Sequence, residues 1–200
     1  MRPPPFNDSD RQLPAGKPAD TTRLWQPDDA QPVIRRLGPQ DSEAIVEHYR
    51  RLDENDRYLR FFRIASEASI RSFVEGFDWS RTILVGALVD GVVCGLGEIG
   101  WSEASGPFVA EFAISVDRDW RHRGLAGWLM DAACDIAFRE GVHAVEVRWL
   151  SGNDPVHRLV RRRGGTIQRE GSVLLGTFYT DRAARPMYPG LPVQGGAARR

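Results

Sequence analysis

A short basic loop, Arg121-His122-Arg123-Gly124-Leu125-Ala126, carries residue types that bind a phosphate group. It follows a strand-like run that ends at Val116 and leads into a helix-like run that begins at Gly124. The N-terminus of a helix offers unpaired backbone N–H groups and the positive end of the helix dipole, and both favour an anion. Gly124 has no Cβ to obstruct a ligand, and Arg121 and Arg123 add positive charge. The loop therefore predicts a phosphate or pyrophosphate site.

The elements that must position this loop can be inferred from the alternation of apolar residues. Asp90-Gly91 separates two apolar runs, Thr82–Val89 and Val92–Ile99, and this pattern predicts a β-hairpin. After the loop, apolar residues recur at helical spacing until Gly141, the glycine expected just beyond a helix end. Asp154-Pro155 is expected to open a further helix, with Asp154 as its N-cap. Together the runs predict the element order β-α-α-β-β-β-α-β-α-β-β.

The composition is that of a one-domain globular protein. The chain has 200 residues, of which 42% are hydrophobic, and its formal net charge is zero. Nothing in the global charge points to a nucleic acid or an anionic membrane as a partner. The two cysteines, Cys94 and Cys134, lie in apolar runs without CxxC spacing or a nearby base. We therefore expect a reduced, cytoplasmic protein with no metal site and no acyl-cysteine intermediate.

The two ends of the chain differ from its centre. Residues 1–30 are rich in proline and polar residues and have little apolar surface to bury, so we expect a disordered leader. Residues 183–200 show the same character and are expected to form a flexible tail. The folded domain is expected to span residues 31–182. No secretory signal or transmembrane run is visible.

The loop motif also resembles a known signature. Arg121-x-x-Gly124-x-Ala126, after a strand ending in valine, is similar to the (Gln/Arg)-x-x-Gly-x-(Gly/Ala) motif of the GNAT superfamily of acyl-CoA N-acyltransferases. The resemblance covers roughly residues 33–181. It implies a single α/β domain with a mixed, mostly antiparallel sheet of about seven strands and about four flanking helices. It also implies two central parallel strands that splay apart, and acetyl-CoA as the donor.

The resemblance implies where the donor binds. The pantetheine arm is expected between the strand that ends at Val116 and the strand His143–Leu150, pairing with the backbone near Ile114 and Val116. The Val116 amide is expected to polarise the thioester carbonyl. Asn153 matches the family's cofactor-contacting asparagine, although a turn residue fits that position equally well. The pyrophosphate is expected on the loop and the first helical turn, at Arg121, His122, Arg123, Gly124, Leu125, Ala126 and Gly127.

An acceptor amine has a pKa of about 10.4 and must lose a proton before it attacks a thioester. In Ala110-Glu111-Phe112-Ala113, Glu111 occupies the position where bacterial protein-lysine acetyltransferases of this superfamily place their base. By itself, Glu111 would fit a solvent-facing strand residue paired with an arginine. Glu98 on the neighbouring strand is the alternative base. Val160 stands where many members have a tyrosine that protonates the leaving thiolate, and Gly164-Gly165 replaces the usual Gly-Phe.

The same branch is resembled by Tyr58-Leu-Arg-Phe-Phe62, which favours a protein lysine as acceptor. An apolar channel for the lysine stem is expected from Phe61, Phe62 and Phe112, with Glu111 at its floor. The acidic residues Asp53, Glu54 and Asp56 keep open a small-molecule amine, such as a polyamine, an amino acid or an antibiotic. A non-catalytic acetyl-CoA-binding module is the alternative from another class. A homodimer is also left open.

Overall fold

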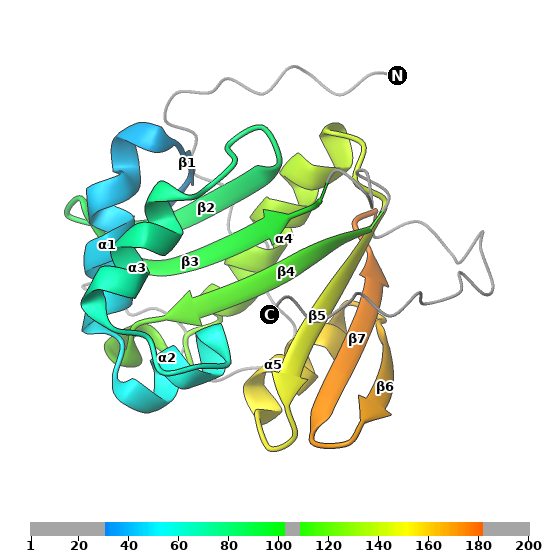
Figure 1. Ribbon diagram of the computed structural model, residues 1–200. Helices are drawn as coiled ribbons and strands as arrows, with labels where there is room; N and C mark the ends of the chain where they lie inside the picture. Colours follow the sequence, from blue (N-terminus) through cyan, green and yellow to red (C-terminus); the bar gives the residue numbers. More distant parts are fainter. Residues whose placement is uncertain (1–30, 103–108, 182–200) are drawn as a thin grey trace.

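The seven strands occur along the chain where the sequence predicted strands. The computed structural model describes residues 31–102 and 109–181, so the expected leader, the tail at 183–200 and the loop around 105–107 lie outside the described residues. The strands are β1 (Val33–Leu37), β2 (Thr82–Val89), β3 (Val92–Gly100), β4 (Val109–Val116), β5 (Ala144–Leu150), β6 (Thr166–Glu170) and β7 (Val173–Tyr179). They form one seven-stranded sheet in the order β1-β2-β3-β4-β5-β7-β6 (Figure 1). Only the β4–β5 pair is parallel among these neighbours.

The predicted hairpin is confirmed. Asp90 and Gly91 both have positive φ angles, 51° and 79°, between the antiparallel strands β2 and β3. Two successive left-handed residues give the turn a twist that matches the flanking strands, and aspartate and glycine tolerate that conformation best.

The described residues form five α-helices, one more than the sequence predicted. They are α1 (Ser42–Arg51), α2 (Glu54–Phe61), α3 (Glu67–Glu75), α4 (Leu125–Arg139) and α5 (Asp154–Arg162). The additional helix is α2, whose N-cap Asp53 accepts a hydrogen bond from the Asp56 N–H at 2.8 Å. The N-cap of α5 is Asn153 rather than Asp154, so this helix begins one residue earlier than predicted. None of the helices in 31–102 and 109–181 combines the length and apolar character needed to cross a bilayer.

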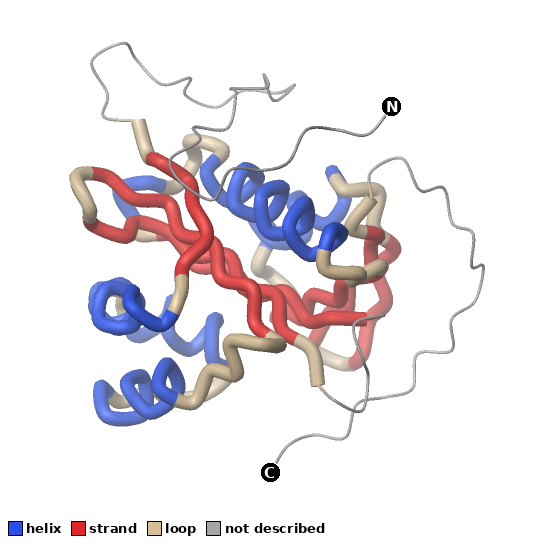
Figure 2. Tube along the Cα trace, turned by 90° about the horizontal axis from the view of Figure 1, so that it is seen from above, coloured by secondary structure: helices blue, strands red, loops and turns tan. Residues whose placement is uncertain are grey.

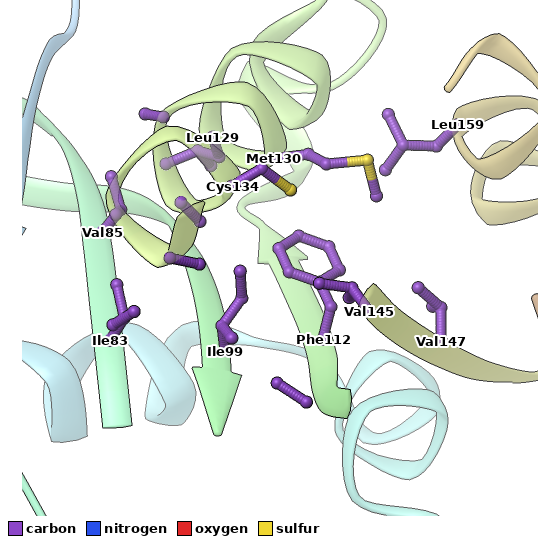
Figure 3. Packing of buried hydrophobic residues seen from close by; sticks show 14 of the residues in the cluster. Ile83, Val85, Ile99, Phe112, Leu129, Met130, Cys134, Val145, Val147 and Leu159 are labelled. Carbon is purple, nitrogen blue, oxygen red and sulfur yellow. The ribbon is translucent and has the colours of Figure 1, made fainter. Parts of the chain in front are cut away.

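Helices cover both faces of the sheet (Figure 2). On one face, α4 packs over β2, β3 and β4 and α5 packs over β6 and β7. Phe112 of β4 points toward Met130 and Cys134 of α4 (Figure 3). On the other face, α1 and α3 bury Ile45, Tyr49 and further apolar residues against β1, β2 and β3. Each fully buried aliphatic or aromatic side chain contributes about 1.5–3 kcal/mol. The first core includes Ala110 and Phe112, and it therefore fixes the position of β4, which carries Glu111, Ile114 and Val116 of the expected site.

Candidate active site

The two central strands separate along their length. The parallel pairing of β4 with β5 runs only from Val109↔Ala144 to Glu111↔Glu146. Beyond this point β4 remains paired with β3 as far as Val116, and β5 remains paired with β7 as far as Leu150. Figure 1 shows the two strands diverging from their shared end. Their facing edges are therefore open over the second half of each strand.

The register shows which backbone groups face this open edge. The Asp117 N–H donates to the Cys94 carbonyl on the β3 side at 2.9 Å, and Val116 lies opposite Gly95. Because hydrogen-bonding direction alternates along an antiparallel strand, the N–H and C=O groups of Ile114 and Val116 point away from β3. No described strand pairs with them there. An extended ligand can add to such an edge as a further strand.

The basic loop leads into α4 through two left-handed residues. His122 has φ 60° and Gly124, the N-cap of α4, has φ 80°. Among the described residues, the N–H groups of Gly124, Leu125 and Ala126 have no backbone acceptor, whereas the Gly127 N–H donates to the Gly124 carbonyl at 2.9 Å. Unpaired amides at the start of a fifteen-residue helix form a cradle suited to pyrophosphate.

The arginines of the loop face protein partners. Arg121 donates to the Val116 carbonyl at 3.0 Å and forms an ion pair with Asp56 of α2. The Arg123 guanidinium lies over the Trp120 ring, 5.2 Å from its centroid. The sequence predicted that both side chains add charge to the phosphate site; in the structure the ion pair with Asp56 offsets the Arg121 charge and joins the loop to α2. An anion held by this loop would therefore contact mainly backbone amides.

Three consecutive arginines, Arg161–Arg163, stand at the end of α5 and differ in their exposure. Arg163 is buried, 3.3 Å from Asp131 of α4 and stacked over Phe178. Arg162 reaches the α4 N-terminus, where a Cβ added to Gly127 would lie 3.5 Å from its Nη2 atom. The sequence carried no signal for this approach, because α5 and the loop are brought together only by the fold. Arg162 is the additional cation available to a phosphate group on the loop.

Glu111 is accessible on the sheet face opposite Phe112. Its side chain is 63% exposed and lies 3.8 Å from Arg148 Nη1. Arg148 also donates to Glu146 at 3.1 Å, and Glu146 is directly opposite Glu111 in the parallel ladder. An ion pair at this exposure contributes about 0–1 kcal/mol, so it does not lock the Glu111 carboxylate away from an incoming amine. The sequence prediction did not include Glu146, although it is the register partner of Glu111.

Glu98, the alternative base, is engaged in a buried ion pair. Its carboxylate pairs with Arg60 of α2, and both side chains are largely buried. Arg60 also donates to the Tyr49 hydroxyl at 3.2 Å, and burial raises the Tyr49 pKa to about 12. Removing one partner of a buried ion pair destabilises a protein by about 3–5 kcal/mol. Glu98 therefore anchors α2, and Glu111 is the carboxylate open to an acceptor.

The apolar channel expected beside Glu111 is wrong. Phe112 is buried against α4, on the sheet face opposite Glu111. Phe61 packs edge-on against Tyr49 and Phe73, with ring centroids 5.2 and 5.3 Å apart. Phe62, at the left-handed C-cap of α2, is 42% exposed. Of the three phenylalanines, only Phe61 packs with Tyr49 and Phe73. The three rings therefore line no common channel.

Two positions after β5 affect the expected chemistry. The Asn153 backbone N–H donates to the Leu150 carbonyl at 3.0 Å, while its side chain makes no capping bond to α5. Val160 is fully buried, and a Cβ added to Gly165 would approach its Cγ1 to 2.6 Å. Gly165 thus permits the close packing of α5 that holds Val160 in the core. No acid stands at position 160 to protonate a leaving group.

The two thiols are expected to resist modification in the folded protein. Burial raises the pKa of both Cys94 and Cys134 to about 11. Because the thiolate is the reactive form, native alkylation at pH 7.5 should be slower than in the denatured chain by roughly two orders of magnitude or more. Labelling with iodoacetamide with and without guanidinium checks this. Rapid labelling of either thiol in the native protein would contradict this expectation and support an acyl-cysteine intermediate.

The chain is similar to a known protein family and to several solved structures. Residues 43–165 match the family described as Acetyltransferase (GNAT) family. The GNAT domain of S. lividans PAT has a TM-score of 0.65 at 21% identity, covering 74% of this chain and 90% of that one. YncA from Salmonella typhimurium, solved with its cofactor acetyl-CoA, has a TM-score of 0.58 at 20% identity, covering 79% and 99%. The PaiA N-acetyltransferase of Thermoplasma acidophilum, in complex with coenzyme A, has a TM-score of 0.52 at 18% identity, covering 73% and 97%.

Proposed function

The chain belongs to the acetyltransferase (GNAT) family, and we propose that it transfers an acetyl group from acetyl-CoA directly to a lysine side chain of a protein. Family membership makes it an acetyltransferase that uses acetyl-CoA as donor and an amine as acceptor. The exposed apolar surface on and beside α2, described below, is the observation that carries the protein acceptor.

The proposed roles of the chain's residues follow from the open edge and the loop. The amides of Gly124, Leu125 and Ala126 hold the pyrophosphate, with His122 and Gly127 beside them. Ile114 and Val116 pair with the pantetheine arm, and Asn153 contacts the donor from the start of α5. Acetyl-CoA supplies a thioester carbonyl carbon, which the amine nitrogen attacks as the carbon–sulfur bond breaks.

Two groups of the chain act on that step. Glu111 accepts a proton from the acceptor ammonium, directly or through water, because its carboxylate is open to solvent. The Val116 N–H points to the open edge, where it donates to the oxygen that becomes negative in the transition state. The thiolate leaves without a tyrosine at position 160, because Val160 is sealed in the core.

The α2 surface favours a protein over a small amine. Tyr58, Phe62 and Ile64 are 44%, 42% and 95% exposed. Helix α2 contacts β4. Arg60 lies near the end of α2, and the negative charge of Glu111 helps to raise the Arg60 pKa. Tyr58 and Phe62 lie one helical turn apart at the end of α2, and exposed apolar groups beside a site favour contact with a protein. The acidic cluster that would attract a polyamine is partly neutralised, because Asp53 pairs with Arg118 and Asp56 pairs with Arg121.

A small cationic amine remains the second candidate because of one observation. Glu111 and Glu146 face each other across the parallel strands, with Arg148 close to both. Two carboxylates and one arginine leave a net negative charge beside the open edge, which suits a diamine or a polyamine. The two candidates therefore differ in whether the apolar α2 surface or the carboxylate pair dominates acceptor choice.

We expect protein lysines to be acetylated faster than free lysine or spermidine. The measurement is kcat/KM by thiol release at matched pH and salt, with a panel of lysine-containing proteins, including an acyl-CoA synthetase. Ile64→Ser should lower kcat/KM for the preferred protein by about ten-fold or more, since a hydrophobic contact contributes up to about 1.5–3 kcal/mol, and leave small amines unchanged. Phe138→Ser, at an exposed phenylalanine on α4, is the matched control. A wide margin for spermidine would favour the small-amine candidate.

A further inference from the structure

A fully buried histidine lies under the end of β4. His48 of α1 has no exposed surface, and its two ring nitrogens each approach a polar group of the strand end. Nε2 lies 2.8 Å from Ser115 Oγ, and Nδ1 lies 3.0 Å from Asp117 Oδ1. The GNAT signature of this chain includes neither His48 nor its partners. Burying an imidazole is unfavourable unless its polar atoms have partners. Here Nε2 has Ser115 as its hydrogen-bond partner, whereas Nδ1 lies beside the Asp117 carboxylate without hydrogen-bond geometry.

The two partners of His48 flank a single residue, Val116. The C=O and N–H of a trans peptide point in opposite directions, so the Ser115–Val116 peptide directs its carbonyl toward β3 and its N–H toward the open edge. Ser115 and Asp117 extend their side chains to the α1 face, where one rigid ring contacts both. The imidazole thereby resists rotation of this peptide about the strand axis.

We call His48 together with Ser115 and Asp117 the brace. A second residue of α1 also holds Asp117. Arg51, one turn further along α1, donates to Asp117 Oδ2 through Nε at 3.2 Å and Nη2 at 3.1 Å. Arg51 also donates to the Val93 carbonyl of β3. Because α1 is itself buried against the sheet, the side chain of Asp117 has little freedom to move. His48 differs from Arg51 in that it alone joins Asp117 to Ser115.

We propose that His48 is a positioning residue for acetyl transfer, which holds Ser115 and Asp117 and thereby keeps the Val116 N–H directed at the reacting carbonyl. This inference rests on the proposed role of Val116. The order Ser115–His48–Asp117 is that of a nucleophilic triad. However, Ser115 is only 9% exposed and its hydroxyl lies under α1, whereas the open edge is formed by backbone groups. The serine is part of the brace and does not attack the thioester.

Removing the ring should affect turnover more than donor binding. In His48→Leu, we expect kcat to fall by roughly ten- to a hundredfold, somewhat less than the 10²–10³-fold effect of deleting an oxyanion donor outright. The acetyl-CoA Kd should change by less than about threefold, because the loop amides carry the pyrophosphate. The matched control is Val46→Ala, at a buried α1 residue that packs in the apolar core and has no polar side-chain atom to bond Ser115 or Asp117. If kcat falls equally in the two variants at comparable Tm, the role of His48 is only structural.

Ser115→Ala gives a milder variant and closes a double-mutant cycle. If His48→Leu and Ser115→Ala both free the Ser115–Val116 peptide, the kcat of the double variant should be little lower than that of the worse single variant. Changes at independent sites would instead add. Additive losses would overturn the brace. Rescue of part of the rate in His48→Gln, which retains one hydrogen-bonding group, is expected.

A readout without turnover separates this inference from the proposed function. Acetyl-CoA should slow hydrogen exchange of the Val116 amide in the natural protein, and this protection should be lost in His48→Leu but kept in Val46→Ala. If the natural protein releases no thiol with any amine yet shows this pattern, the proposed function fails and the brace stands. If the protection is unchanged in His48→Leu, the brace is wrong whatever the acceptor.

Discussion

Replacing Glu111 with glutamine should lower turnover by roughly 10²–10⁴-fold, the range of a lost general base. Glutamine keeps the size of the side chain but cannot accept the proton of the acceptor ammonium. Because the Glu111 side chain is 63% exposed and lacks a close ion pair, the fold should tolerate the change. The acetyl-CoA Kd from calorimetry should remain within about threefold of the natural value, since the loop proposed to hold the pyrophosphate is untouched.

The pH dependence of the loss of turnover in Glu111→Gln tests whether Glu111 acts as the base. A free alkylammonium has a pKa of about 10.4, so the fraction of neutral amine rises with pH and the need for a base falls. The ratio of natural to Glu111→Gln rates should therefore shrink as the pH is raised from 7 toward 10. A constant ratio would mean that Glu111 serves another purpose, such as holding the acceptor.

Glu146→Gln provides the matched control for Glu111→Gln. Glu146 is the register partner of Glu111, shares Arg148 with it and is likewise a strand glutamate at the point where β4 and β5 separate. We expect it to lose less than tenfold in turnover, because its carboxylate is paired with Arg148 at 3.1 Å. An equal loss in both variants would assign the proton transfer to the carboxylate pair. Near-normal turnover of Glu111→Gln would shift the role to water or Glu98.

Local features of the fold were predictable because a few adjacent residues determine them. The Asp90-Gly91 turn needs two left-handed residues, and the α4 terminus needs a glycine at C′, which Gly141 supplies with φ 86°. The loop at Arg121–Gly124 combines a strand end, a glycine and a helix start, so its geometry could be inferred before the structure. The splay of β4 and β5 followed from the family resemblance rather than from any residue pattern.

The missed features depend on contacts between distant segments. Asp56 and Arg121 are 65 residues apart, so their ion pair could not be inferred from either segment alone. His48 occupies one position of an ordinary amphipathic helix, and only the packing of α1 reveals its partners. Phe112 is different, because strand alternation already places it on the face opposite Glu111. The expected channel conflicted with this rule, and an explicit assignment of faces would have excluded it.

Replacing Gly124 with valine is expected to weaken acetyl-CoA binding by about ten- to a hundredfold, equivalent to one or two lost hydrogen bonds to a charged group at about 1.5 kcal/mol each. Gly124 has φ 80°, and a Cβ added there would meet no protein atom within 4 Å. The added side chain therefore enters open space at the N-terminus of α4, beside the loop where the pyrophosphate is expected. It also strains a backbone that β-branched residues avoid, and this tilts the amide of Gly124 itself.

Gly141→Val separates these two effects, because Gly141 has the same conformation at the other end of α4. Its φ is 86°, and a Cβ added there also meets nothing within 4 Å. Both variants should lose about 1–2 kcal/mol of stability from the left-handed strain, with similar falls in Tm. Only Gly124→Val should lose acetyl-CoA affinity in calorimetry. Unchanged affinity in a folded Gly124→Val protein would show that the pyrophosphate does not bind at this loop. An equal loss of affinity in both variants would mean that strain in α4, rather than obstruction of the loop amides, controls donor binding.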